Sequence, residues 1–357
     1  MLNWKAPTAL RSNVGELTGQ ALRAALGAAD NTEDAIVSLP LETRLRIAIC
    51  VAPHCGDVTL VNDLGRWLDE TAGAGNFEAI SDGSTWASTF GPGEILLFEH
   101  SVSMAVRPTD TGQDSIRGLL SAGFTESQIV AASQITAFTA YFGRLRRAVD
   151  LLDELSRNDY ASILIPYSEI NERVFGHPRQ EYPLMDWRGF VVGAPARGPK
   201  SPNDDAKGAS DYYSVLRHEE GFLGVRTELY DTIMTGEGEL DRSDREFVAL
   251  ATSLETGCEF CASVHGRRHF FLSKDTVSSP RLKHLGIAGL TSPRERALAG
   301  FASAMAMTPS IVEAGHIEAL REHGLNDQQI MDAASVSSMF SWANRLMLTL
   351  GEGTTQK

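Results

Sequence analysis

The sequence predicts a mainly α-helical protein that contains two copies of one helical unit. Apolar residues recur at spacings of three and four along most of the chain, which is the pattern of one buried helix face. The chain shows neither an alternation of strands and helices nor a series of evenly spaced short strands. In addition, matching residues recur at a constant offset of 201 positions without a gap. These three observations predict an all-α fold with a tandem duplication.

The duplication is visible in residue pairs spread over about a hundred positions. They are Arg44 and Arg245, Gly56 and Gly257, Pro108 and Pro309, Gly123 and Gly324, Ile129 and Ile330, and Arg144 and Arg345. A constant offset over such a length is hard to obtain by chance. We therefore predict a first repeat in residues 1–165, a linker in 166–210 and a second repeat in 211–357.

The first repeat carries helical periodicity in four segments, which are residues 42–52, 59–68, 91–106 and 125–155. Thr125 stands three positions before Gln128, close to a capping box for the last of these helices. The linker is rich in Pro, Gly and charged residues, above all in 196–210, which we expect to be mobile. Tyr182 and Trp187 suggest that its earlier part packs against the protein.

The second repeat contains a Cys-x-x-Cys-x-x-x-His stretch, formed by Cys258, Cys261 and His265. If a helix begins near Cys258, these three side chains lie along one face of it, because positions three and four apart are neighbours on a helix. Gly257 marks the end of a preceding helix that carries Glu246. A helical hairpin would therefore bring one carboxylate, one imidazole and two thiols together.

This set of groups suits thiol redox chemistry. The thiolate is the reactive form of cysteine, and a helix N-terminus or a neighbouring histidine favours it. A second thiol one helical turn away can resolve a sulfenic acid as a disulfide. Glu246 and His265 are suited to carry the proton away from the attacking thiol. In a long chain with four cysteines, such a pair is more often catalytic or metal-binding than structural.

The stretch resembles the active site of the AhpD-like alkylhydroperoxidases of the carboxymuconolactone decarboxylase superfamily. That family pattern is a Glu, eleven residues and then Cys-x-x-Cys-x-x-x-His, as in Glu246, Cys258, Cys261 and His265. Residues 337–346 also resemble the family's aromatic-x-x-x-Asn-Arg-Leu ending. One departure is that Glu259 and Phe260 fill the slot between the two cysteines in which some members carry a histidine.

The resemblance implies a peroxidase that reduces hydroperoxides through a dithiol and disulfide cycle. It implies that Cys261 attacks, that Cys258 resolves, and that His265 and Glu246 relay the proton. An external dithiol would reduce the disulfide, and the chemistry would need no cofactor and no metal. The fused pair of repeats would replace two subunits, and we expect further association into a homo-oligomer, a dimer or trimer.

The first repeat lacks this chemistry. The offset of 201 places Leu45, Asp57, Leu60 and Leu64 at the positions of Glu246, Cys258, Cys261 and His265. Nearby Cys50, His54 and Cys55 occupy other positions, and we interpret them as core or surface residues. The second repeat is therefore predicted to hold the single site, and His269 is interpreted as a half-exposed bystander.

Three other functions fit parts of the motif. Two cysteines, one histidine and one glutamate are the ligand types of a zinc site, although no second distant ligand pair is visible. A lactone decarboxylase is the other activity of the superfamily, but that reaction does not need the cysteine pair. A redox-sensing or scaffold protein that is not an enzyme is the third alternative.

Composition restricts the setting. The formal net charge of −14 argues against a nucleic-acid or anionic-membrane surface. No apolar run of 18 residues is present, and the first 20 residues lack the apolar core of a signal peptide. We therefore expect a cytoplasmic protein without membrane or nucleic-acid partners.

Overall fold

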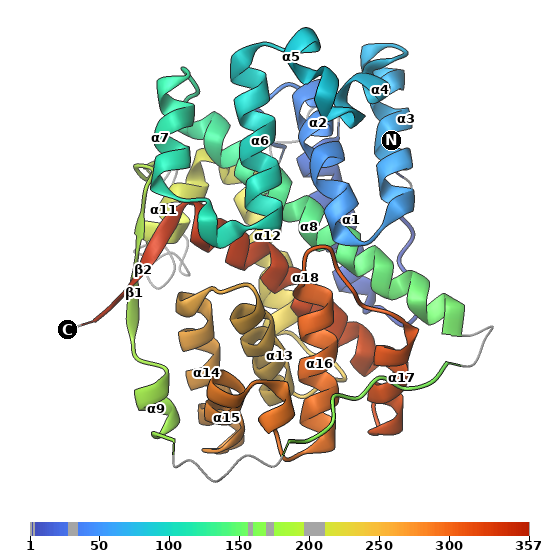
Figure 1. The fold of residues 1–357 in the computed structure, drawn as a ribbon, viewed down its shortest axis with the longest axis vertical. Coiled ribbons are helices and arrows are strands. Elements are labelled where there is room, and N and C mark those ends of the chain that lie inside the picture. The colour runs from blue at the N-terminus through green and yellow to red at the C-terminus, as the bar shows by residue number, and fades with distance from the viewer. Residues whose placement is uncertain are drawn as a thin grey trace.

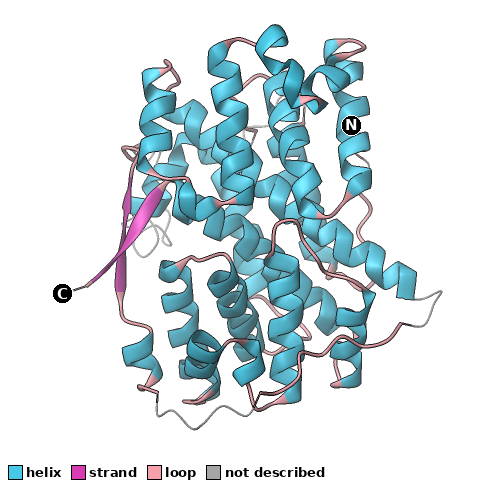
Figure 2. Ribbon diagram, in the orientation of Figure 1, coloured by secondary structure: helices cyan, strands magenta, loops and turns pink. Residues whose placement is uncertain are grey.

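A computed structural model describes residues 2, 4–27, 35–155, 160–168, 175–195 and 211–356. Helices dominate these residues, which confirms the predicted all-α class (Figures 1 and 2). No helix in the described part of the chain is long and apolar enough to cross a membrane. The segment 196–210, which we expected to be mobile, lies outside the described residues.

The helices fall into two series. The first is α1 (Ser12–Leu26), α2 (Leu41–Val51), α3 (Val58–Ala72), α4 (Asn76–Ser81), α5 (Trp86–Thr89), α6 (Pro92–Val106), α7 (Gln113–Ser121) and α8 (Glu126–Leu155). After α9 (Pro178–Glu181) and β1 (Met185–Gly189), the second is α11 (Asp211–Leu216), α12 (Glu220–Met234), α13 (Arg242–Glu255), α14 (Glu259–Ser273), α15 (Ser278–Leu285), α16 (Pro293–Ala306), α17 (Ala314–Glu322) and α18 (Asp327–Thr349), followed by β2 (Gly351–Thr355).

The offset of 201 positions also relates the observed helix starts. The first residues of α13, α14, α16, α17 and α18 each lie 201 positions after those of α2, α3, α6, α7 and α8. The turns agree as well, because Gly56 and Gly257 have φ of 80° and 75°, and Gly123 and Gly324 have φ of 95° and 86°. A residue with a side chain is strained in that region, which explains why both copies use glycine there.

Side-chain caps start the long helices that the sequence predicts. The backbone N–H of Gln128 donates to Thr125 Oγ1 at 3.2 Å, and the side chain of Gln128 accepts from the N–H of Thr125 at 3.0 Å. Asn326 and Gln329 form the same reciprocal pair at the start of α18, with both distances at 2.9 Å. Each pair satisfies two donors that the first helical turn leaves free.

The two repeats pack face to face around one hydrophobic core. Helices α8 and α18 cross the middle of the molecule against each other, and α1 packs against α12 (Figure 1). An aromatic cluster fills the junction, with Phe138 lying 5.3 Å from Trp342 and 5.8 Å from Phe142 between ring centroids. Because the core is shared, the division into residues 1–165, 166–210 and 211–357 stays a prediction.

Two buried arginines join the repeats by reciprocal capping. Arg144 on α8 donates to the carbonyls of Met305 and Met307, at the C-terminus of α16, at 2.7 and 2.9 Å. Its counterpart Arg345 on α18 donates to the carbonyl of Ala105, near the C-terminus of α6, at 2.9 and 3.1 Å. A cation is favourable at these helix ends because their carbonyls are unsatisfied and carry partial negative charge. The arginine that occurs at this position in both repeats therefore joins each repeat to the other.

The described parts of the linker lie along the second repeat. The backbone N–H of Ser168 donates to the carbonyl of Ala288 at 2.9 Å. Further on, β1 pairs with β2 in an antiparallel ribbon, and the indole of Trp187 donates to the carbonyl of Met347 at 2.9 Å. Tyr182 is buried, so the earlier part of the linker packs as its aromatic residues suggest.

Candidate functional site

The site lies on the hairpin of α13 and α14, which pack closely against each other. Gly257, with φ of 75°, makes the turn, and Cys258 stands at the N-cap of α14 with extended backbone angles. The N–H of Cys258 returns to the carbonyl of Ser253 at 2.9 Å, which closes the end of α13. The predicted helix start at Cys258 is therefore observed. In the first repeat the same N-cap is Asp57, which accepts from the N–H of Leu60.

Both cysteines of the motif are free thiols and are buried, with 1% and 4% of Cys258 and Cys261 exposed. The interaction with the neighbouring Cys258 thiol, together with burial, raises the pKa of the Cys261 thiol well above its usual range. Cys261 therefore needs a base and a stabilising charge before it can react as a thiolate.

Glu246 and His265 face each other across the hairpin. Oε2 of Glu246 lies 2.5 Å from Nδ1 of His265, and both side chains are buried. Burial lowers the pKa of His265 and outweighs the opposite effect of Glu246, so the ring is neutral and donates its Nδ1 proton. That tautomer leaves Nε2 of His265 as a proton acceptor. The ring of Phe340 packs edge-on against the imidazole, with 4.4 Å between ring centroids.

Arg242 is the second residue that donates hydrogen bonds to the carboxylate of Glu246. Its Nε and Nη2 atoms donate to Oε1 of Glu246 at 2.9 and 2.7 Å. Burial acts to raise the pKa of Glu246, but the hydrogen bonds from His265 and Arg242 outweigh it and hold the pKa at about 2. Glu246 is therefore ionised at neutral pH. Arg242 was not predicted, although its position four residues before Glu246 is the spacing of a helical ion pair.

The two thiols contact different cavities. Cys261 and His265 line a cavity of about 230 Å³ between α12, α14 and α18, together with Arg226 and Phe260. Cys258 lines another cavity of about 330 Å³ on the side of Tyr182 and β1. A ligand in the first cavity therefore meets Cys261, whereas Cys258 is approached from the other side of α14.

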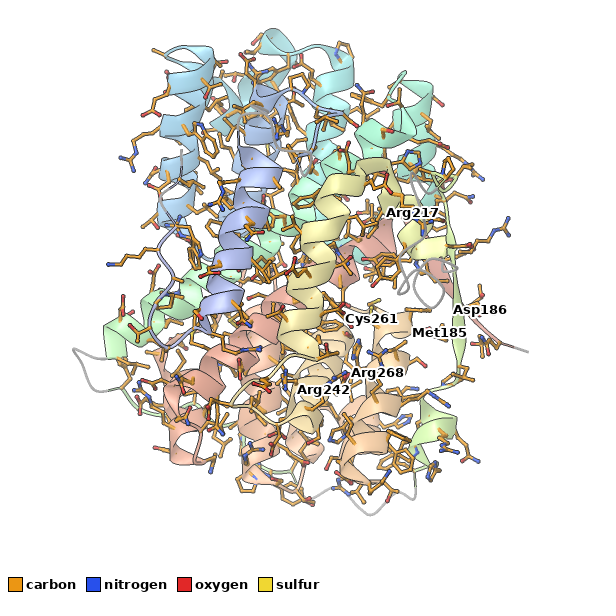
Figure 3. The ribbon with its side chains drawn as sticks, turned by 180° about the vertical axis from the view of Figure 1, so that it is seen from behind. Met185, Asp186, Arg217, Arg242, Cys261 and Arg268 are labelled. Carbon is orange, nitrogen blue, oxygen red and sulfur yellow. The ribbon has the colours of Figure 1, made fainter. Side chains whose placement is uncertain are left out.

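Glu246 borders a third hollow, of about 410 Å³, on the outer face of α14. Arginine side chains surround it, namely Arg179, Arg242, Arg267 and Arg268. Arg268 also lines the Cys261 cavity, and Figure 3 shows Arg268 and Arg242 both below Cys261. The Glu246–His265 pair thus bridges the Cys261 cavity and a basic surface hollow.

The remaining candidates occupy other places. His269 is buried and not half-exposed as interpreted, with Nδ1 lying 2.7 Å from Oγ of Ser279. Cys50 and Cys55 are buried free thiols in the first repeat. Within the described residues, no group of three or more His, Cys, Asp or Glu side chains is placed to hold a metal ion. The four motif residues instead pair as two thiols and as a carboxylate with an imidazole.

Arg226 is the functional candidate that the motif did not reveal. It lies on α12, is 2% exposed and lines the Cys261 cavity. The sequence held one signal for it, because Arg226 stands between Phe222 and Leu229 at helical spacing. A charged residue on such an apolar face is rarely buried without a purpose.

Comparison with known proteins agrees with the resemblance of the motif. Residues 220–269 match the model of the Carboxymuconolactone decarboxylase family. This match includes Arg226 and all four motif residues. This part of the second repeat is therefore similar to the carboxymuconolactone decarboxylase family, in agreement with the resemblance of the motif.

Two solved structures are similar to part of the chain. One is an alkylhydroperoxidase AhpD core, a peroxidase-related protein from Ralstonia eutropha JMP134, with 25% identity and a TM-score of 0.37 over 41% of this chain and 78% of that one. The other is a peroxidase-related protein from Silicibacter sp. TM1040, with 26% identity and a TM-score of 0.36 over 43% of this chain and 86% of that one. No curated protein matches the chain.

Proposed function

We propose that the second repeat is a thiol-dependent peroxidase that reduces organic hydroperoxides through Cys261 and Cys258. The observation that carries the proposal is the arrangement around Cys261. Its thiol contacts the Cys258 thiol on one side, and it shares a cavity with His265, whose orientation Glu246 holds. The similarity of residues 220–269 to the carboxymuconolactone decarboxylase family, whose superfamily includes AhpD-like peroxidases, supports the same function.

The first step generates the nucleophile. Because the pKa of Cys261 is raised, a base has to accept the thiol proton, and Nε2 of His265 is available for it. Protonation makes His265 a cation, which the ionised carboxylate of Glu246 stabilises at 2.5 Å. The thiolate then attacks the terminal oxygen of the hydroperoxide. The O–O bond breaks, and the departing alkoxide takes the proton from His265 and leaves as an alcohol.

The second step converts the oxidised cysteine into a disulfide. Cys261 now carries a sulfenic acid, and the Cys258 sulfur attacks it. Water leaves with the Cys258 proton, and a Cys258–Cys261 disulfide forms. An external dithiol then supplies two electrons and two protons and regenerates both thiols. The net reaction converts one hydroperoxide and one dithiol into one alcohol, one water and one disulfide.

The position of Cys258 suits its role as the resolving thiol. It stands at the N-cap of α14, three residues before Cys261, so the two sulfurs are neighbours without any rearrangement of the helix. Its own cavity, beside Tyr182 and Lys283, would allow a reductant to reach the disulfide from the side opposite the hydroperoxide. We therefore propose that substrate and reductant approach different faces of α14.

The cytoplasmic location and the homo-oligomeric assembly also stay predictions.

Mass spectrometry of the cysteines tests the proposal. Wild type and Cys258→Ser are treated with one equivalent of cumene hydroperoxide and then with dimedone, which labels sulfenic acids. We expect a Cys258–Cys261 disulfide in wild type and a dimedone adduct on Cys261 in the variant. Catalytic consumption of the hydroperoxide with dithiothreitol should accompany the disulfide, and Cys261→Ser should abolish it.

Three results would contradict the proposal in different ways. Unchanged cysteines in wild type would exclude thiol peroxidase chemistry. A disulfide without turnover would favour a redox sensor. An adduct on Cys258 in Cys261→Ser that forms as fast as the adduct on Cys261 in Cys258→Ser would reverse the proposed roles.

A further inference from the structure

We propose that Arg226 supplies the positive charge that stabilises the thiolate of Cys261. The inference deepens the proposed peroxidase function and rests on Cys261 being the reactive thiol. It names a charge-stabilising residue outside the Cys-x-x-Cys-x-x-x-His stretch. Glu259 and Phe260 fill the slot between the cysteines in which some members of the superfamily carry a histidine, so the motif brings no permanent cation next to Cys261, and its His265 is neutral before it accepts a proton.

The guanidinium of Arg226 is held in place beside the thiol. Arg226 and Cys261 line the same cavity of about 230 Å³. Nη2 of Arg226 donates to the hydroxyl of Tyr212 at 2.7 Å, and its carbon Cζ lies 5.4 Å and 5.6 Å from the ring centroids of Tyr212 and Trp342. Aromatic faces attract a cation, so these contacts fix the group without neutralising it.

The charge of Arg226 lacks a carboxylate partner among the contacts that the structure describes. These contacts are a phenol hydroxyl and two aromatic rings, and Nε has no acceptor among the described residues. A buried cation in such surroundings is costly unless an anion forms nearby. The thiolate of Cys261 is that anion. The charge of Arg226 acts to lower the pKa of Cys261, against the larger opposite effects of the Cys258 hydrogen bond and burial.

The first repeat provides an internal comparison. Helices α1 and α12 each contain 15 residues, and Thr18 and Arg226 are both the seventh residue of their helix and both buried. This alignment of the two helices has an offset of 208 positions and not of 201. The hydroxyl of Tyr141, the counterpart of Trp342, lies 2.7 Å from the hydroxyl of Thr18. Packing of this helix against the core therefore does not require an arginine.

The arginine and the thiol occur together. The repeat with Thr18 at this position has Leu60 in place of Cys261 and Leu64 in place of His265, and both leucines are buried. The repeat with the two thiols has Arg226. This coincidence supports a role for Arg226 in the chemistry of the site and not in the fold.

Other titratable groups also face the Cys261 cavity, and the test must distinguish their effect on Cys261 from that of Arg226. They are Tyr212 and Tyr213 from α11, Tyr230 from α12, and His265 and Arg268 from α14. The Cys258 thiol interacts with Cys261, and Glu246 pairs with His265. The residues from α18 are Phe340, Ala343 and Met347, which do not titrate. Arg268 is exposed, so it is the matched control for a cation at the same cavity.

Alkylation of Cys261 as a function of pH tests the inference and needs no peroxide. Full-length wild type, Arg226→Gln, Arg226→Lys and Arg268→Gln are reacted with iodoacetamide, and the Cys261 peptide is followed by mass spectrometry. We expect Arg226→Gln to move the midpoint of the rate profile upward by about one pH unit or more and to slow the reaction about tenfold at pH 7. Arg226→Lys should restore most of the rate, and Arg268→Gln should move the midpoint by much less.

Two results would overturn the inference. One is an unchanged midpoint in a folded Arg226→Gln protein, and the other is an equal shift in Arg226→Lys, which keeps the charge. If Arg226→Gln does not fold, the experiment uses Tyr212→Phe instead. That change removes the hydrogen bond that holds the guanidinium of Arg226 and keeps the charge of Arg226. An unshifted profile in Tyr212→Phe then also counts against the inference. A shifted profile in a protein without peroxide turnover would support the role of Arg226 and reject the peroxidase instead.

Discussion

Replacement of Glu246 by glutamine tests the electrostatic reasoning about the site. The carboxylate is fully buried and accepts hydrogen bonds from His265 and Arg242. Its pKa falls from an ordinary value of 4.5 to about 2 on folding. At about 1.4 kcal/mol per pH unit, the ionised group contributes about 3 kcal/mol to the free energy of unfolding at pH 7. Glu246→Gln should lose this amount, because the amide keeps the shape but not the charge.

The pH dependence gives the prediction its sign. A carboxylate whose pKa is lowered on folding stabilises the protein fully above the unfolded pKa, and this contribution disappears as the pH falls towards the folded pKa. The gap in stability between wild type and Glu246→Gln should therefore be largest at pH 7. It should narrow by about 2 kcal/mol at pH 3, where the unfolded carboxylate of wild type is already protonated.

Urea unfolding followed by circular dichroism at several pH values measures this gap. Glu322→Gln is the matched control, because Glu322 is exposed on α17, and its change should stay within about 0.5 kcal/mol at every pH. A gap for Glu246→Gln that does not change between pH 7 and pH 3 would refute the assignment of an ionised, hydrogen-bonded Glu246. The variant should also lose peroxide turnover, because His265 loses the charge that stabilises its protonated form.

Two further predictions concern the scaffold. Arg345→Met should lower the free energy of unfolding by about 3 kcal/mol, because it leaves the buried carbonyl of Ala105 without the two N–H donors of Arg345. Arg117→Met on an exposed face of α7 should change it little, and equal melting temperatures for the two variants would contradict the capping role. Gly143→Ala should lower the free energy of unfolding by about 1–3 kcal/mol, since the added methyl group would meet Cβ of Cys55 at 2.6 Å. Gly118→Ala is the control, because the added methyl group meets open space, and it should be neutral or stabilising. An unchanged free energy of unfolding for Gly143→Ala in urea would contradict this packing.

The sequence by itself determined the class of fold and the local geometry of the hairpin. Helical periodicity and the offset of 201 positions predict the duplicated helices, because both depend on spacing along the chain. The same spacing places Cys258 and Cys261 one turn apart and directs Glu246 across the hairpin towards His265, as observed. These features are local, so intervals between residues are sufficient to predict them.

Only the tertiary structure decided how the site is surrounded. The separation of Cys258 and Cys261 into different cavities depends on which helices pack on each side of α14. Arg226 approaches from α12, and Arg345 caps a helix of the other repeat, across more than 200 positions of sequence. Such contacts arise from the way two helical layers fill space against each other, and helical spacing along one segment carries no information about the partner that it meets.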